Sequence, residues 1–206
     1  MELTPKHRET LSELINIGYG RAAAALSELT SQRIVLEAPK VEVLSIDRVR
    51  DALQNMLKGD ISSVHQVFSG PVAGHALLLL ETEAADLLTT AIMGEEVPSE
   101  NKRAVRREAL TEVGNIVLQA SLGVCGDLLQ VHVSFSVPVL HVDTVDDILQ
   151  SITVEQRELQ FALLVRTRFE VLKSQVSGYL LVILGVTSFS KLLNELDNWE
   201  RRELSR

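Results

Sequence analysis

The spacing of hydrophobic and polar positions divides the chain into segments with either a helical or an extended period. The first segment has apolar residues at helical spacing, and it follows Thr4, a suitable N-cap, and Pro5, which fits the first helical position. β-branched stretches predict strands, and a glycine-proline pair between two of them predicts a hairpin. The elements predicted for this half are a helix over 5–29, strands over 33–38 and 40–46, a helix over 49–59, hairpin strands over 61–70 and 72–81, and a helix over 82–94.

The second half of the chain repeats this order after a polar connector at 95–102. A shift of 99 residues aligns Glu9 with Glu108 and Pro39 with Pro138, which indicates an internal duplication. We therefore predict an α+β fold, in which pseudo-two-fold halves of about 1–98 and 99–206 pack long helices on a shared, largely antiparallel sheet in one domain. The elements predicted for the second half are a helix over 103–126, strands near 130–137 and 139–144, a helix near 144–151, strands near 158–175 and 178–185, and a last helix over 188–204.

Composition narrows the class of protein. Hydrophobic residues make up 46% of the chain, charged residues 23% and aromatic residues 4%, which is typical of a globular protein with an aliphatic core. The net charge of −8 argues against a nucleic-acid surface, where phosphates require clustered basic side chains. The single cysteine, Cys125, cannot form an internal disulfide, and its position beside the apolar face of its helix predicts a packed thiol.

No segment indicates export or a membrane. The N-terminus is polar and lacks an apolar signal region, and the longest apolar run, 179–186, is too short to span a bilayer. We therefore expect a cytoplasmic protein without a membrane partner.

A line of polar residues runs along the first long helix and recurs on the second. Helical geometry places Glu13 at about 40° and Asn16 at about −20° from Glu9, opposite the apolar face. The corresponding residues Glu108, Glu112 and Asn115 oppose the apolar face of the second helix in the same way. Both triples are therefore predicted to point outward.

The simplest interpretation of one such triple is a solvated helix face. Two copies at the same spacing favour a duplicated site instead, because each Asn is followed after 22 residues by a proline, Pro39 or Pro138. Neighbouring positions that we expect at the surface, such as Thr10, Ser12 and Tyr19, do not match their counterparts, so the polar line is retained where its surroundings differ.

The pattern Glu-x2-Asn-x22-Pro, present twice, resembles the motif of the CheC/CheX/FliY phosphatases of chemotaxis. The resemblance covers the whole chain and is closest to the CheC type, which has both copies. The run Asn-Ile-Gly-x-Gly at 16–20 is also similar to the family's first helix. The family motif begins with Asp or Ser four residues before its Glu, where this chain has Glu9 and Glu108 in supporting positions.

The resemblance implies hydrolysis of the aspartyl phosphate on a CheY-like response regulator. Asn16 and Asn115 would position the attacking water, and Glu13 and Glu112 would anchor the regulator. The resemblance implies no cofactor of the chain's own, since Mg²⁺ belongs to the regulator.

Two alternatives remain open from the sequence. One is a binding module with little or no catalysis, which holds a response regulator or the receptor deamidase CheD, as members of the family do. The other is a metal hydrolase, which the dispersed histidines and the absence of a ligand motif disfavour.

Gly18 is predicted to permit close helix packing, and Gly20 to allow a partner's backbone to approach.

Overall fold

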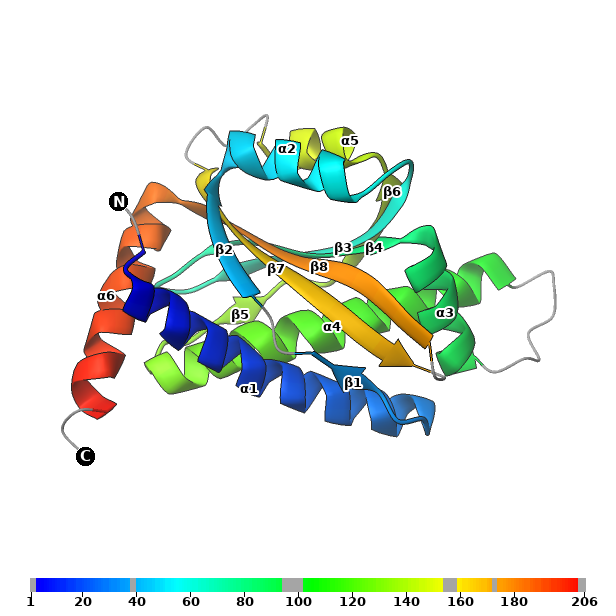
Figure 1. Cartoon of the computed structure of the whole chain (residues 1–206), viewed down its shortest axis with the longest axis horizontal. Coiled ribbons are helices and arrows are strands. Elements are labelled where there is room, and N and C mark those ends of the chain that lie inside the picture. Colours follow the sequence, from blue (N-terminus) through cyan, green and yellow to red (C-terminus); the bar gives the residue numbers. More distant parts are fainter. Residues whose placement is uncertain (1–2, 38–39, 94–101, 154–158, 172–173, 204–206) are drawn as a thin grey trace.

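The computed structural model describes residues 3–37, 40–93, 102–153, 159–171 and 174–203 (Figure 1). The helices are α1 (Pro5–Thr30), α2 (Ile46–Met56), α3 (Thr82–Met93), α4 (Lys102–Leu129), α5 (Val145–Thr153) and α6 (Val186–Glu203). The strands are β1 (Val35–Leu36), β2 (Lys40–Ser45), β3 (Ile61–Ser69), β4 (Gly74–Glu81), β5 (Ser134–Phe135), β6 (Val139–Asp143), β7 (Leu159–Val171) and β8 (Ser174–Gly185).

Among the described residues, the eight strands belong to one sheet, and every pairing in it is antiparallel. The strands run in the order β1-β7-β8-β4-β3-β5, with β2 beside β7 and β6 beside β3. Each half thus contributes its two leading strands to the hairpin of the other half, and the central pair β4–β8 joins the halves. This exchange confirms the predicted α+β fold with duplicated halves on a shared sheet.

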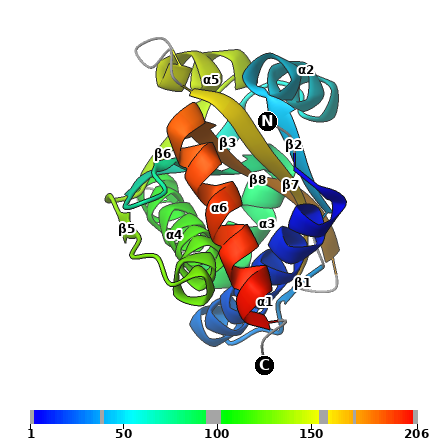
Figure 2. The same cartoon turned by 90° about the vertical axis from the view of Figure 1, so that its left-hand side faces the viewer.

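Helices cover both faces of the sheet in three layers (Figure 1). The long helices α1 and α4 lie side by side on one face together with α3, and α6 crosses their ends (Figure 2). The larger apolar core fills the space between these four helices and the sheet. The short helices α2 and α5 cover the opposite face over a smaller core. No helix in the described ranges is long and apolar enough to cross a membrane.

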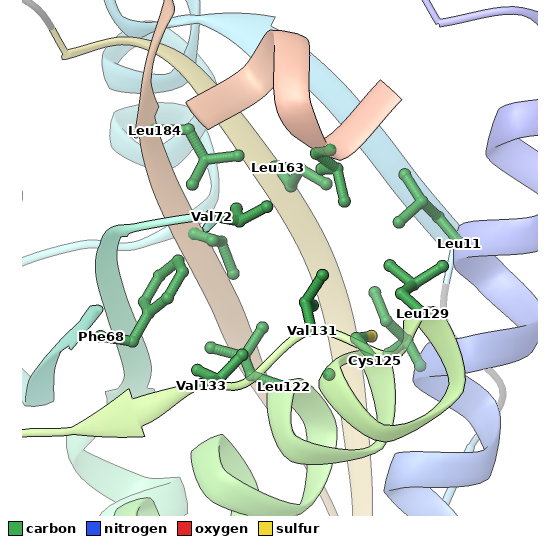
Figure 3. Close-up of a pocket in the computed structure, with 14 residues that line it drawn as sticks. Leu11, Phe68, Val72, Leu122, Cys125, Leu129, Val131, Val133, Leu163 and Leu184 are labelled. Carbon is green, nitrogen blue, oxygen red and sulfur yellow. The ribbon is translucent and has the colours of Figure 1, made fainter. Parts of the chain in front are cut away.

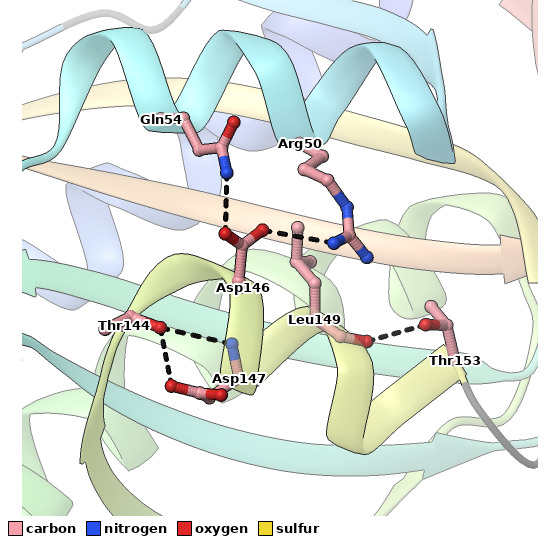
Figure 4. Close-up of polar contacts among 7 residues, drawn as sticks. All are labelled: Arg50, Gln54, Thr144, Asp146, Asp147, Leu149 and Thr153. Carbon is pink, nitrogen blue, oxygen red and sulfur yellow. Dashed lines mark hydrogen bonds and ion pairs between the residues drawn. The ribbon is translucent and has the colours of Figure 1, made fainter.

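The two short helices belong to different halves and are joined by polar contacts at the surface (Figure 4). Asp146 of α5 accepts hydrogen bonds from Arg50 Nη1 at 3.1 Å and from Gln54 Nε2 at 2.7 Å, both on α2. The Thr144 hydroxyl accepts from the Asp147 amide at 3.3 Å and donates to the Asp147 carboxylate at 2.6 Å, which caps α5.

Some predicted boundaries are wrong. Gly178 lies inside β8, whereas the sequence reads it as the start of a strand, and β8 begins at Ser174. A Cβ on Gly178 would lie 2.7 Å from Leu80 Cδ2 and 3.0 Å from Phe169 Cε2, so this glycine serves close packing. Leu29 is 44% exposed although its spacing predicted burial, because the buried stripe of α1 passes through Leu26. Thr10 and Tyr19 were expected at the surface, but the structure buries both. The predicted join near residue 98 lies outside the described residues.

Candidate functional site

Close packing of α1 on α4 decides which faces of these helices remain open. A Cβ on Gly18 would lie 2.6 Å from the Ser121 Cα and 2.8 Å from the Ala120 carbonyl oxygen, so the two backbones nearly touch here. The expectation that Gly18 permits close packing is thereby met. Gly114 brings α4 equally close to β3, where its Cβ would lie 2.3 Å from the Val64 side chain. Both helices therefore bury one face and expose the other.

The first polar triple lies on the open face of α1. Glu9, Glu13 and Asn16 are all exposed. Within the described part of the chain, none of the three has a hydrogen-bonding or ionic partner. Ile17 is 42% exposed beside them, and no atom lies within 4 Å of a Cβ built on Gly20. These groups can meet another molecule without breaking a contact of their own.

The second triple differs at its amide. Glu108 and Glu112 are exposed, but Asn115 is half-buried, so it is less open than predicted. Its Oδ1 accepts hydrogen bonds from Gln119 Nε2 at 2.6 Å and from Gln66 Nε2 at 3.2 Å. Gln66 lies on β3, is fully buried, and also donates to the Ser136 carbonyl oxygen at 2.9 Å.

Of the two motif prolines, Pro138 lies among the residues that the structure describes. Pro39 lies outside the described residues. Pro138 is half-buried between β5 and β6, next to the strongly exposed Val137 (82%). Arg107 of α4 donates to the Leu140 carbonyl oxygen at 3.1 Å, which holds this segment beside the second triple.

Two residues of the second site were missed by the sequence reasoning. Gln119 lies four residues after Asn115, so helical spacing could have found it. Gln66 lies 49 residues away, and no local pattern connects it to Asn115.

An apolar cavity of about 60 Å³ lies between α1, α4, α6 and the sheet (Figure 3). Its lining includes Leu11 from α1, Cys125 from α4 and Leu163 from β7. Burial raises the pKa of the Cys125 thiol to about 12, so the group stays protonated and is a poor nucleophile at neutral pH. The cavity contributes no polar group that could perform hydrolysis.

The histidines gather more than the sequence suggested. His65 on β3 hydrogen-bonds His75 on β4 across 2.9 Å, and the two rings stack with centroids 5.1 Å apart. The His141 ring lies 6.5 Å from that of His65. Even so, no group of three or more His, Cys, Asp or Glu side chains among the described residues is placed to hold a metal ion.

Comparison with known proteins finds similarity to CheC, FliY and FliM. The chain is 22% identical to the CheY-P phosphatase CheC of Bacillus subtilis over 190 residues, covering 89% of this chain and 90% of that protein. Its fold is similar to FliY of Thermotoga maritima, with a TM-score of 0.77, 20% identity, and coverage of 97% of this chain and 100% of the other. It is also similar to FliM of H. pylori, from a FliM–SpeE complex, with a TM-score of 0.69, 13% identity and coverage of 97% and 98%. No protein-family model matches the chain.

Helices that carry a repeated Glu/Asn line on a shared antiparallel sheet define the chain as a CheC-like α+β protein. The sequence similarity to CheC spans nearly the whole of both chains. The chain is thus a distant relative of CheC, and its fold is similar to those of FliY, FliM and CheX.

Proposed function

We propose that the chain is a phosphatase that hydrolyses the aspartyl phosphate of a CheY-like chemotaxis response regulator. The observation that carries the proposal is the exposed, unpartnered Glu13 and Asn16 on helix α1, in a relative of CheC. An exposed helix face suits a substrate that is itself a folded protein, because the reactive group must be reached inside the regulator.

The chemistry matches these residue types. An acyl phosphate is already activated, so the phosphatase needs chiefly to place a water in line with the phosphorus. A carboxamide oxygen can accept a hydrogen bond from that water, which is the role of Asn16 and of Asn115. Glu13 and Glu112 anchor the regulator by pairing with a lysine near its phosphoaspartate, and Glu9 and Glu108 add negative charge one turn earlier.

The chain supplies no cofactor in this proposal. The Mg²⁺ ion that neutralises phosphate charge belongs to the regulator, and the reaction takes place in the cytoplasm, where such regulators work. The pseudo-two-fold arrangement gives one domain with two sites, so that each chain can bind two regulators.

The test is the rate of phosphate loss from a phosphorylated CheY-type receiver domain. We expect wild type to accelerate it, and Asn16→Ala combined with Asn115→Ala to lose on the order of 100-fold, about 3 kcal/mol of barrier lowering. Asn194→Ala, an exposed Asn on α6, is the matched control and should keep full activity. A double variant as fast as wild type would refute the assignment of the water-positioning residues.

The alternative function is a binding module without catalysis. The fold similarity to FliM favours this alternative, because the fold also occurs in a protein other than the phosphatase CheC. Such a module would bind the phosphorylated receiver domain, or the deamidase CheD, without accelerating phosphate loss. Calorimetric titration with both proteins, beside the hydrolysis assay, separates the two functions.

A further inference from the structure

The orientation of the Asn115 carboxamide follows from its neighbours. The Ser136 carbonyl oxygen can only accept, so the Gln66 group that faces it at 2.9 Å is the NH₂ group. The same NH₂ group lies 3.2 Å from Asn115, which must therefore present its oxygen. Gln119 Nε2 donates to this oxygen as well, at 2.6 Å. Both lone pairs of the Asn115 Oδ1 are thus occupied by protein donors.

The first site has no equivalent of the buried donor. In the second site β6 pairs with β3, and in the first site β2 pairs with β7 in the equivalent way. Val64 of β3 lies opposite Leu140, as Val165 of β7 lies opposite Val41. Gln66, two residues after Val64, therefore has Thr167, two residues after Val165, as its counterpart. Thr167 is fully buried, and its hydroxyl hydrogen-bonds the hydroxyl of Tyr19. It therefore makes no hydrogen bond with Asn16.

The first site also lacks a hydrogen-bond donor equivalent to Gln119. Gln119 corresponds to Gly20 under the shift of 99 residues, and glycine has no side chain to donate. A Cβ at Gly20 would have no neighbour within 4 Å, so the space beside Asn16 is open. Asn16 has no hydrogen-bond partner in the described part of the chain.

We infer that the two sites are unequal, with Asn16 free to orient water and Asn115 restrained by Gln66 and Gln119, which act as positioning residues. This inference rests on the proposed function for its kinetic consequence. A water that binds Asn115 Oδ1 must displace a donor, whereas at Asn16 it finds a free oxygen. The net free energy of one such hydrogen bond corresponds to a hydrolysis rate about threefold to tenfold lower at the second site than at the first.

The kinetic test isolates each site in turn, by the hydrolysis rate of a phosphorylated receiver domain. We expect Asn16→Ala to reduce kcat more than Asn115→Ala does. In the Asn16→Ala background, Gln119→Ala should raise kcat threefold to tenfold with little change in KM. In the Asn115→Ala background, Gly20→Gln should lower kcat, because it supplies the first site with the missing donor. Gln150→Ala, at an exposed position on α5, is the control and should change neither constant.

A second measurement keeps the inference testable if the proposed function fails. Side-chain ¹⁵N relaxation should show a rigid Asn115 carboxamide and a mobile Asn16 carboxamide in the wild type. Gln119→Ala should increase the mobility of Asn115, and Gln66→Met should do so further, provided that its thermal unfolding remains cooperative. Equal mobility of the two amides, or a larger kcat loss in Asn115→Ala than in Asn16→Ala, would overturn the inference. Absence of hydrolysis in the wild type would count only against the proposed function.

Discussion

His65 shows how strongly one residue depends on its surroundings. Its imidazole lies against His75 and near His141, in a pocket that Asp143 and Asp147 also line. Burial, followed by repulsion from the two neighbouring imidazoles, lowers the pKa of His65 from 6.5 to about 4. The group is therefore neutral in the folded protein at neutral pH, where one ring nitrogen of the His65–His75 pair donates and the other accepts.

This pKa predicts acid sensitivity of the fold. In the unfolded chain His65 binds a proton near pH 6.5, but in the folded protein only near pH 4. Between these values the unfolded state holds more protons, so the free energy of unfolding falls as the pH falls. Urea unfolding from pH 7.5 to pH 4.5 should show a steeper loss for wild type than for His65→Gln. The difference should be a fraction of about 1.4 kcal/mol per pH unit, because His65 is partly open to solvent. The same pH dependence of the unfolding free energy in wild type and His65→Gln would contradict this prediction.

Residue types and helical spacing were enough to place the first Glu/Asn line on an open face, but not to describe the second site. Asn16 and Asn115 have the same spacing from Glu and the same helical phase. The difference arises from Gln66, which the fold brings from β3, and from Gly114, whose missing side chain lets α4 approach that strand. A contact between a strand and a helix 49 residues apart leaves no periodic signal in the sequence.

At the scale of elements, the close packing of α1 on α4 depends on Gly18. Ala is a better helix former than Gly by up to about 1 kcal/mol, so Gly18→Ala would stabilise an isolated helix. In the folded protein its Cβ would lie 2.6 Å from the Ser121 Cα, and a backbone atom cannot move aside alone. Overpacking costs about 1–3 kcal/mol, so after the gain in helix propensity we expect Gly18→Ala to lower the free energy of unfolding by up to about 2 kcal/mol.

Gly123 on α4 offers the matched control for this prediction. A Cβ there would meet no atom within 4 Å, so Gly123→Ala should gain helix propensity without a clash. Urea unfolding should show it to be as stable as wild type or more stable, by up to about 1 kcal/mol. If both alanine variants changed stability in the same direction, close helix packing would not be the reason for Gly18.

Element types were more predictable than element ends. Apolar residues at helical spacing and β-branched stretches identify all six helices and eight strands of the described residues. The ends depend on contacts that a local pattern does not contain. Gly178 is predicted to start a strand, yet it lies inside β8, where Leu80 and Phe169 leave no room for a side chain.

At the scale of the whole molecule, duplication links the two halves through their strands. β2 of the first half pairs with β7 of the second, and β6 pairs with β3 in return. Neither half can complete its sheet without the other, so we interpret the chain as one cooperative unit. The cores nevertheless need not be equally well packed, because the sequences of the two halves have diverged.

The cavity in Figure 3 lies where elements of both halves meet, and it offers a test of packing. Apolar cavities cost about 24 cal/mol per Å³, so a volume of about 60 Å³ corresponds to about 1.4 kcal/mol. Val131 lines this cavity, and Val131→Ile adds one methyl group toward it. We expect the variant to recover about 0.5–1 kcal/mol of unfolding free energy in urea. Val113 on α4 is fully buried away from the cavity, so Val113→Ile has no space to fill and should cost about 1–3 kcal/mol. A loss of stability in both variants would mean that the cavity is too rigid or too narrow to accept a methyl group.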